Sequence, residues 1–273
     1  MFTRCILAIV FALTFTLPSF AQAPWQFRWQ KGQTLTYKIK HVTSVVEVID
    51  KKTNASNSNL DLVNRWQVTD VDAKGVATMT LTLVSMRNEQ KRANGDTLLF
   101  DSQNLEKSTP ELREAMKKFI GQTVAALRMD GYGRVLEVTQ GSAATLETEP
   151  PFVVIFPAAP AAVGQVWRRQ FNVVLDPPYG TGEKFEAEQR YDCKKLEAGK
   201  ATVAVTTHYK AMPDNPRERL PLLQKDVQGE MVFDVPAGRL VSAQLNIDKT
   251  IEHHQGKGSS YHFKSQYTRT LVE

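Results

Sequence analysis

Apolar and polar residues alternate with a period of two along most of the chain. In the stretch 75–84, Ala77, Met79 and Leu81 share one face while threonines occupy much of the other, and the stretch 199–209 shows a similar pattern. This alternation is typical of β-strands that bury one face. It predicts strands over residues 33–49, 60–71, 76–86, 166–175, 201–209, 240–251 and 261–271.

Short turns that contain glycine separate the expected strands, so most neighbours should pair antiparallel. These turns lie at residues 72–75, 130–133, 197–199 and 256–258. The polar run Thr53–Asn59 offers no apolar face, and we expect it to form an exposed loop between the first two long strands.

Similar short motifs occur in the same order in the two halves of the chain. They are Gly32-Gln33 and Gly164-Gln165, Arg65-Trp66 and Arg190-Tyr191, and Asp130-x-x-Gly133-Arg134 and Asp234-x-x-x-Gly238-Arg239. This order predicts a duplicated β unit, with a first half over 24–149, a proline-rich connection over 150–163 and a second half over 164–273. The alternative is that the two halves are similar by chance, because all chains built of strands and turns share glycines and alternation.

One segment departs from the β pattern. Residues 110–120 place Leu112, Met116 and Phe119 on one helical face, and Thr109 precedes them as a candidate N-cap. The helix either forms a lid over a cavity in a curved sheet or simply covers one sheet face. As a lid, it would line a ligand-binding site with Leu112, Met116 and Phe119.

These elements together predict the fold class. We expect a mainly β protein in which two similar antiparallel halves form a curved sheet or incomplete barrel, with one covering amphipathic helix. The mature chain of about 250 residues is long enough to bury a substantial core without cross-links.

The N-terminus has the features of a secretory signal peptide over residues 1–21. A basic start, MFTR, precedes an apolar run that is shorter than the roughly 20 residues needed to span a bilayer. Cleavage after Ala21 and cleavage after Ala23 both stay open, as does an uncleaved N-terminal anchor. We therefore expect export to the periplasm or the extracellular space, with a soluble protein after cleavage.

Charge and cysteine content restrict the classes of partner and of cross-link. The 34 Lys and Arg residues exceed the 29 Asp and Glu residues by five, and the positive residues are scattered along the chain. In an exported protein this argues against nucleic acid and leaves peripheral contact with an anionic membrane open. Of the two cysteines, Cys5 lies in the expected signal peptide, so Cys193 has no intramolecular partner after cleavage.

Two motifs of the second half carry a resemblance. The P-x-x-V-G-x-x-W motif at 160–167 and the F-D-x-x-x-G-R-L motif at 233–240 resemble an uncharacterised family of exported bacterial β-rich proteins, a domain of unknown function. The resemblance is best over residues 156–273 and implies an antiparallel β fold in the cell envelope. It brings no catalytic residue and no cofactor. A curved sheet with a covering helix is also similar, at the level of fold, to periplasmic lipoprotein and lipid carriers.

Histidines supply the weak candidates for a metal site. His254 and His262 flank the turn at 256–258, and two registers keep the apolar faces of that hairpin together. Only the register with Gln255 opposite Tyr261 places His254 opposite His262. Because no third ligand has suitable spacing, we expect no bound metal and a pair that faces solvent.

No catalytic motif stands out. Cys193 falls at the position of Val68 in the other half, so we expect it to fill a strand position. The sequence therefore favours a noncatalytic envelope protein that binds a lipid or another apolar ligand. We expect no cofactor. The alternative is an interaction or scaffold protein that meets another envelope protein, and a metal-dependent hydrolase is the third hypothesis.

Overall fold

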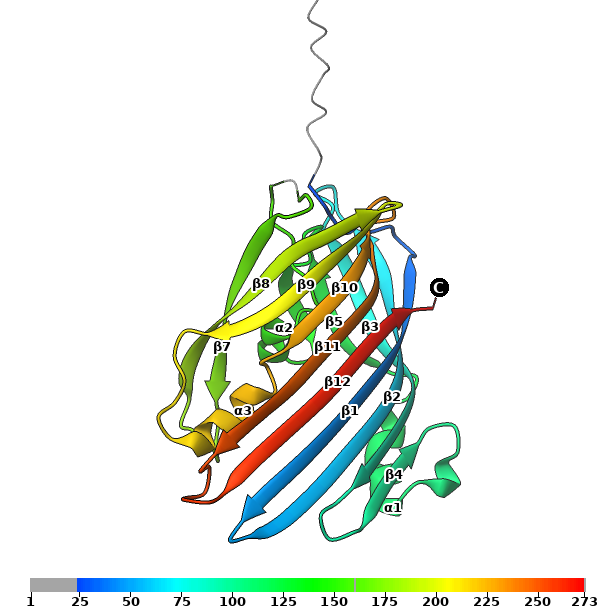
Figure 1. Cartoon of the computed structure of the whole chain (residues 1–273). Helices are drawn as coiled ribbons and strands as arrows, with labels where there is room; N and C mark the ends of the chain where they lie inside the picture. Colours follow the sequence, from blue (N-terminus) through cyan, green and yellow to red (C-terminus); the bar gives the residue numbers. More distant parts are fainter. Residues whose placement is uncertain (1–23, 160, 273) are drawn as a thin grey trace, which may run out of the picture.

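A computed structural model describes residues 24–159 and 161–272, so the expected signal peptide lies outside the described residues. The described residues form a single antiparallel sheet of twelve strands that is strongly curved but not closed into a barrel (Figure 1). This confirms the expected fold class. In the described part of the chain no helix is long and apolar enough to cross a membrane.

The elements follow one another along the chain with short connections. The strands are β1 (Thr34–Ile49), β2 (Lys52–Val71), β3 (Ala77–Lys91), β4 (Thr97–Asp101), β5 (Thr123–Met129), β6 (Val135–Gln140), β7 (Val166–Leu175), β8 (Glu183–Glu197), β9 (Lys200–Tyr209), β10 (Gln228–Asp234), β11 (Arg239–Glu252) and β12 (Ser260–Leu271). The α-helices are α1 (Pro110–Met116), α2 (Ala143–Thr148) and α3 (Leu220–Leu223), and the 3₁₀ helices are η1 (Leu105–Lys107), η2 (Lys117–Phe119) and η3 (Pro216–Arg219).

The last strand of the chain joins the two halves of the sheet. The strand order is β6-β5-β3-β2-β1-β12-β11-β10-β9-β8-β7, and β4 pairs with β3 beside this path. Strands β6 and β7 are consequently the two edges of the open sheet. Helix α2 contacts both edge strands, so it lies between them on the open side.

The two halves pair their strands with the same register. Trp66 of β2 lies opposite Leu35 of β1, and Tyr191 of β8, which matches Trp66 in the sequence comparison, lies opposite Trp167 of β7. Two residues after Trp66 the register of the β2–β3 ladder shifts, just beyond Val68. Two residues after Tyr191 the register of the β8–β9 ladder shifts in the same way, just beyond Cys193. Both observations support the expected duplication, which stays a prediction.

The expected loop at Thr53–Asn59 is wrong, because these residues belong to β2. Strands β1 and β2 are joined by a turn at Asp50 and Lys51, whose φ angles are 50° and 64°. The polar side chains are tolerated there because the backbone ladder with β1 and β3 supplies the pairing. Alternation of side chains therefore missed the part of this 20-residue strand that precedes Leu60.

The helix expected over 110–120 forms as α1 followed by η2, but its surroundings differ from the expectation. Thr109 is the N-cap residue, as expected, but its hydroxyl accepts a hydrogen bond from the Leu99 amide of β4 rather than from the first turn of the helix. Helix α1 packs against β4, and none of its residues is buried. The concave face of the sheet is partly covered instead by α2 and the connection that follows it.

One end of the concave face is filled by an aromatic cluster that consists of Trp25, Phe27, Trp29, Phe152 and Phe156. The ring centroid of Phe27 lies 5.3 Å from that of Phe152 and 5.8 Å from that of Phe156. The cluster residues are at most 8% exposed. Residues before β1 and residues of the proline-rich connection thus close this end of the curved sheet.

Two turns hold the N-terminal segment in place at the closed end. The Phe27 amide donates to the Gly131 carbonyl at 2.7 Å, and the Arg28 amide donates to the Gly238 carbonyl at 3.0 Å. Gly238 has a φ of +61°, and a Cβ atom there would lie 2.6 Å from the Arg28 nitrogen. Glycine is therefore required at this position for both the backbone angle and the close approach.

Candidate functional site

A cavity of about 290 Å³ lies on the concave face, next to the aromatic cluster. On one side it is bounded by strands of the sheet, and on the other by α2, the connection after it and the loop after α3. The lining residues are His41, Asn64, Trp66, Leu81, Thr145, Leu146, Thr148, Glu149, Pro150, Pro151, Val153, Gln189, Gln224, Lys225, Val227, Leu245, Ile247, Ser265, Tyr267 and Arg269.

Much of the cavity wall is apolar because strand alternation directs every second side chain to the concave face. Leu245 and Ile247 come from alternate positions of β11, and Leu81 comes from β3. Leu146 of α2 and Val153 of the connection face them across the cavity. The walls therefore offer apolar surface from two opposite sides.

A histidine and a serine lie side by side in the wall. The distance from His41 Nε2 to Ser265 Oγ is 2.8 Å, and Ser265 is buried. Burial lowers the pKa of His41, and the negative charge of Glu149 acts in the opposite direction. With a pKa below its ordinary value of 6.5, His41 is uncharged at neutral pH.

Arg269 brings a positive charge to the cavity. Its guanidinium carbon lies 5.4 Å from the ring centroid of Tyr37 and 5.9 Å from that of Tyr267, and its Nη1 donates to the Pro151 carbonyl. In the described part of the chain no carboxylate lies within 4.0 Å of it, and its buried Nε has no hydrogen-bond partner. The charge is thus held by rings and a carbonyl, without a counterion.

An ion pair connects two segments that bound the cavity. The Lys225 ammonium, in the loop after α3, contacts the Glu149 carboxylate, which directly follows α2. Because both groups are partly exposed, this pair contributes little to stability by itself. It does neutralise two of the charges that line the cavity.

Two other buried polar atoms of the cavity residues lack partners among residues 24–159 and 161–272. They are the indole Nε1 of Trp66 and the side-chain oxygen of Asn64. Both side chains are more than nine-tenths buried. Buried polar groups are usually hydrogen-bonded in folded proteins, so a molecule bound in the cavity would complete the bonding of these two atoms. The lack of a partner is shared by Trp25 Nε1 in the filled aromatic cluster, so it does not by itself mark a binding site.

The binding residues expected from sequence lie elsewhere. Leu112 and Met116 of α1 are half-buried, and Phe119 of η2 is 40% exposed. None of the three lines the concave cavity. Their role in binding stays a prediction. The cavity residues were missed, although Arg269 stands out as a charged residue on the otherwise mostly apolar face of its strand.

The weak metal candidates are not brought together. Both expected hairpin registers are wrong, because His262 lies opposite Thr250 and His254 lies in the turn beyond β11. His254 is buried rather than facing solvent, with its Nε2 2.8 Å from Glu47, whereas the Nε2 of His262 lies 2.7 Å from Asp248. No group of three His, Cys, Asp or Glu side chains in the described ranges could hold a metal ion.

Cys193 fills a strand position, as expected. It is fully buried on β8 and lies opposite Val203 of β9. Its amide donates to the Gln165 carbonyl, as the Val68 amide donates to the Gln33 carbonyl in the first half. Burial raises the pKa of the thiol, so it is poorly suited to act as a nucleophile.

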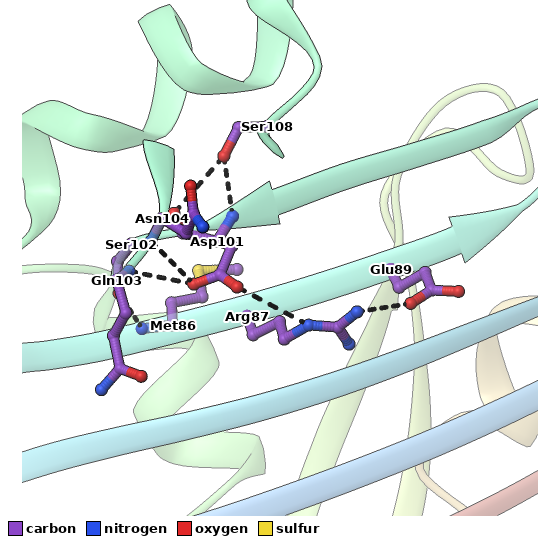
Figure 2. A network of polar contacts seen from close by, with 8 residues as sticks. All are labelled: Met86, Arg87, Glu89, Asp101, Ser102, Gln103, Asn104 and Ser108. Carbon is purple, nitrogen blue, oxygen red and sulfur yellow. Dashed lines mark hydrogen bonds and ion pairs between the residues drawn. The ribbon is translucent and has the colours of Figure 1, made fainter. Parts of the chain in front are cut away.

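A second hollow, of about 360 Å³, is lined by polar residues that include Lys38, Lys40 and Asp61. Figure 2 shows the network at its border, where Arg87 lies between Glu89 and Asp101. Because these half-buried charges pair with one another, the network explains how β4 is fixed to β3 rather than indicating a ligand.

The comparisons with known proteins show a similarity of fold and nothing further. No protein-family model and no curated protein matches the chain. A structure of lipovitellin that concerns its lipid–protein interactions matches with a TM-score of 0.50 and 11% identity, over 89% of this chain and 25% of that chain. The chain therefore spans about a quarter of the length of lipovitellin, and the likeness shows a shared curved β architecture.

Two further structures match more weakly. DynF, from the dynemicin biosynthesis pathway of Micromonospora chersina, has a TM-score of 0.22 and 8% identity, over 98% of this chain and 92% of that chain. The MucA/MucB complex of Pseudomonas aeruginosa has a TM-score of 0.11 and 9% identity, over 85% of this chain and 88% of that chain. Neither similarity supports an inference about this protein.

Proposed function

We propose that the protein is a noncatalytic binding protein of the cell envelope that holds a lipid or another apolar ligand in the concave cavity. The observation that carries the proposal is the cavity itself, which is walled by apolar side chains of the sheet and of α2. Ligand pockets are commonly concave and largely apolar with a few polar groups that orient the ligand. The cavity has this composition.

The aromatic cluster supports this proposal by contrast. It fills the neighbouring part of the same concave face with the chain's own side chains, whereas the cavity leaves part of its apolar wall uncovered. Covering that surface with an apolar ligand would contribute roughly 25 cal/mol per Å² removed from water. The lipid–protein interactions of lipovitellin fit this proposal, although the likeness between the two proteins extends to fold only.

The size of the cavity limits the class of ligand. A volume of about 290 Å³ is at the lower end of the range for ligand pockets. We therefore propose a molecule with a single apolar chain, or one chain of a larger lipid, with the polar end near His41 and Arg269.

Native mass spectrometry tests the proposal directly. The protein would be purified without detergent from the envelope of the cells that produce it, and released molecules would be identified after denaturation. We expect a stoichiometric adduct of lipid mass. A mass that corresponds to the bare chain in repeated preparations would contradict the proposal. The same spectrum gives the mature N-terminus and so tests export with removal of residues 1–21 or 1–23.

A matched pair of variants locates the binding site. Leu245→Trp places a large side chain in the cavity wall, whereas Gln244→Trp makes the same change at the exposed neighbouring position of β11. We expect Leu245→Trp to weaken binding of a neutral apolar fluorescent probe at least tenfold and Gln244→Trp to leave it unchanged. Equal effects of the two variants would place binding outside the cavity.

An interaction role is the second candidate, and the open edges of the sheet favour it. In the part of the chain that the structure describes, no further strand lies beside β6 or β7, and unpaired backbone groups at such edges can accept a strand from a partner. A proline scan of alternate β7 positions, with crosslinking in cells as the measurement, would test it. Unchanged crosslinks in every variant would argue against this role.

A further inference from the structure

We propose that Arg269 recognises an oxyanion at the end of the apolar ligand, so that the cavity selects anionic amphiphiles over neutral ones. The inference rests on the proposed binding function and specifies its ligand class. Its basis is a cation that has no counterion within 4.0 Å among the described residues, placed where apolar walls meet unpartnered polar atoms.

The charges around the cavity leave an excess of one positive charge. The charged lining residues in the described part of the chain are Glu149 (−1), Lys225 (+1) and Arg269 (+1), which sum to +1. Because Glu149 and Lys225 contact each other, the excess belongs to Arg269. His41 adds no charge at neutral pH, since burial lowers its pKa.

The surroundings of Arg269 leave part of its bonding capacity unused. A guanidinium group has five N–H donors in a fixed fork that suits carboxylate and phosphate oxygens. The guanidinium group of Arg269 donates to the Pro151 carbonyl and lies near the rings of Tyr37 and Tyr267, but its buried Nε–H has no partner within the described ranges. An anionic oxygen atom would supply both the missing acceptor and the missing counterion.

A second donor in the same cavity points to the same chemistry. The Trp66 Nε1–H is buried without a partner, and indole nitrogen can only donate a hydrogen bond. The unpaired atoms at Arg269 and Trp66 are both donors, whereas the third unpaired atom of the cavity, the side-chain oxygen of Asn64, is an acceptor, so donors outnumber acceptors two to one among the described residues. Two unused donors and one unneutralised cation favour an acceptor-rich anionic group over a hydroxyl or an ammonium group.

Carboxylate and phosphate share this chemistry, and inorganic phosphate could satisfy it without a lipid. The apolar walls formed by Leu245, Ile247 and Leu81 distinguish the two sources, because a free anion gains nothing from them. We therefore expect the oxyanion to be attached to an apolar chain.

Competition against a neutral fluorescent probe, 1-N-phenylnaphthylamine, tests the inference on the mature protein at pH 8. The competitors are dodecanoate, dodecyl phosphate, dodecanol and inorganic phosphate. We expect both anionic amphiphiles to bind at least tenfold more tightly than dodecanol, and inorganic phosphate alone to displace no probe. Equal affinities for dodecanoate and dodecanol would overturn the inference while leaving the binding function intact.

Two other outcomes are informative in different ways. If neither the probe nor any amphiphile binds, the proposed binding function fails and this inference fails with it. If inorganic phosphate binds as tightly as dodecyl phosphate, the site takes free anions and the amphiphile proposal is wrong.

Matched variants assign the preference to a residue. Arg269→Met keeps a long side chain without the charge, and Arg65→Met is its control, because Arg65 is exposed on β2 between two residues that line the cavity. We expect Arg269→Met to abolish the preference for dodecanoate while dodecanol affinity changes less than twofold. Arg65→Met should behave as the wild type.

A measurement without substitution keeps the inference testable if Arg269→Met does not fold. Raising the NaCl concentration from 20 to 500 mM should weaken binding of dodecanoate to the wild type severalfold, because salt screens the attraction to a partly exposed cation. Dodecanol affinity should not fall. Identical salt dependence for both ligands would overturn the inference.

Discussion

The two ends of the concave face differ in what covers the same sheet. At the closed end, the aromatic cluster fills the curve, and Phe156 lies 4.6 Å from Phe233 between ring centroids. At the other end, α2 and the connection leave the cavity of about 290 Å³. Strand β1 runs through both regions, and its concave positions change from Leu35, Tyr37 and Ile39, which are buried, to His41, which is half-buried.

The difference separates stability from binding. At the closed end, apolar surface of the strands is covered by the chain itself, so it contributes to the free energy of unfolding. At the cavity, part of that surface is left uncovered by the described residues, so it remains available to a ligand. Variants at the two ends should therefore differ in which property they change.

The largest expected effect comes from removing an aromatic ring at the closed end. Phe156→Ala deletes a side chain that is 1% exposed and should lower the free energy of unfolding by about 3–5 kcal/mol. Leu81→Ala, in the cavity wall, should cost less than about 2 kcal/mol, because one side of this residue already faces empty space. Urea denaturation would measure both. Equal losses would remove the distinction between the two ends.

A pair of turn glycines gives the next largest contrast. Gly238→Ala at the closed end adds a Cβ atom that would lie within 2.5 Å of the Arg28 side chain, in addition to the strain of a φ of +61°. We expect a loss of about 3 kcal/mol. Gly256→Ala, in the turn between β11 and β12, has a φ of +102° and no neighbour within 4 Å, so only the backbone strain of about 1 kcal/mol applies.

The same unfolding measurement decides between these values. If Gly256→Ala destabilises the protein as much as Gly238→Ala does, the contact between the turn and Arg28 contributes nothing to stability.

Much of the sheet was predictable because alternation is a local property. The stretch 201–209 forms β9 over Lys200–Tyr209, and the last strand, expected over 261–271, forms β12 over Ser260–Leu271. The polar part of β2 was missed, because its pairing depends on backbone hydrogen bonds and these do not require an alternation of apolar and polar side chains. The hairpin of β11 and β12 was expected in the wrong register because apolar faces alone allow several registers.

The cavity was not predictable for a different reason. It depends on where α2 and the connection at 150–153 cross the sheet, and no local pattern specifies that placement. Helix α1 has the clearer apolar stripe, yet it packs against β4. Arg269 is the one cavity residue that the sequence could have indicated, because it is a charged residue on the mostly apolar face of its strand. The structure was needed to show that this face borders a cavity.

Two tyrosines give a smaller contrast, between a hydroxyl that has hydrogen-bond partners and one that has none among the described residues. The Tyr191 hydroxyl donates at 2.9 Å to the side-chain oxygen of Gln189 and lies 3.2 Å from the Val153 carbonyl. Tyr191→Phe should therefore cost about 1 kcal/mol. Tyr267→Phe, in the cavity wall, should change stability by less than about 0.5 kcal/mol, because its hydroxyl has no hydrogen-bond partner among the described residues. A loss at Tyr267 as large as that at Tyr191 would contradict this assignment.

The smallest expected effect is a pH dependence that originates at His41. Burial among Ser265, Tyr267 and the neighbouring strands lowers its pKa below 6.5, and Glu149 only partly opposes this. The unfolded chain then binds more protons at this site than the folded chain does. Stability is therefore complete above pH 6.5, decreases as the pH falls below 6.5, and levels off below the folded-state pKa.

The comparison of His41→Gln with the wild type isolates this contribution. Glutamine can keep a hydrogen bond to Ser265 but does not titrate, so the variant should lose less stability than the wild type between pH 7.5 and pH 5. Urea midpoints at the two pH values would measure the difference. If both proteins lose the same stability, the histidine is not held uncharged by its burial, and the positive charge of the cavity would then increase in acid beyond that of Arg269.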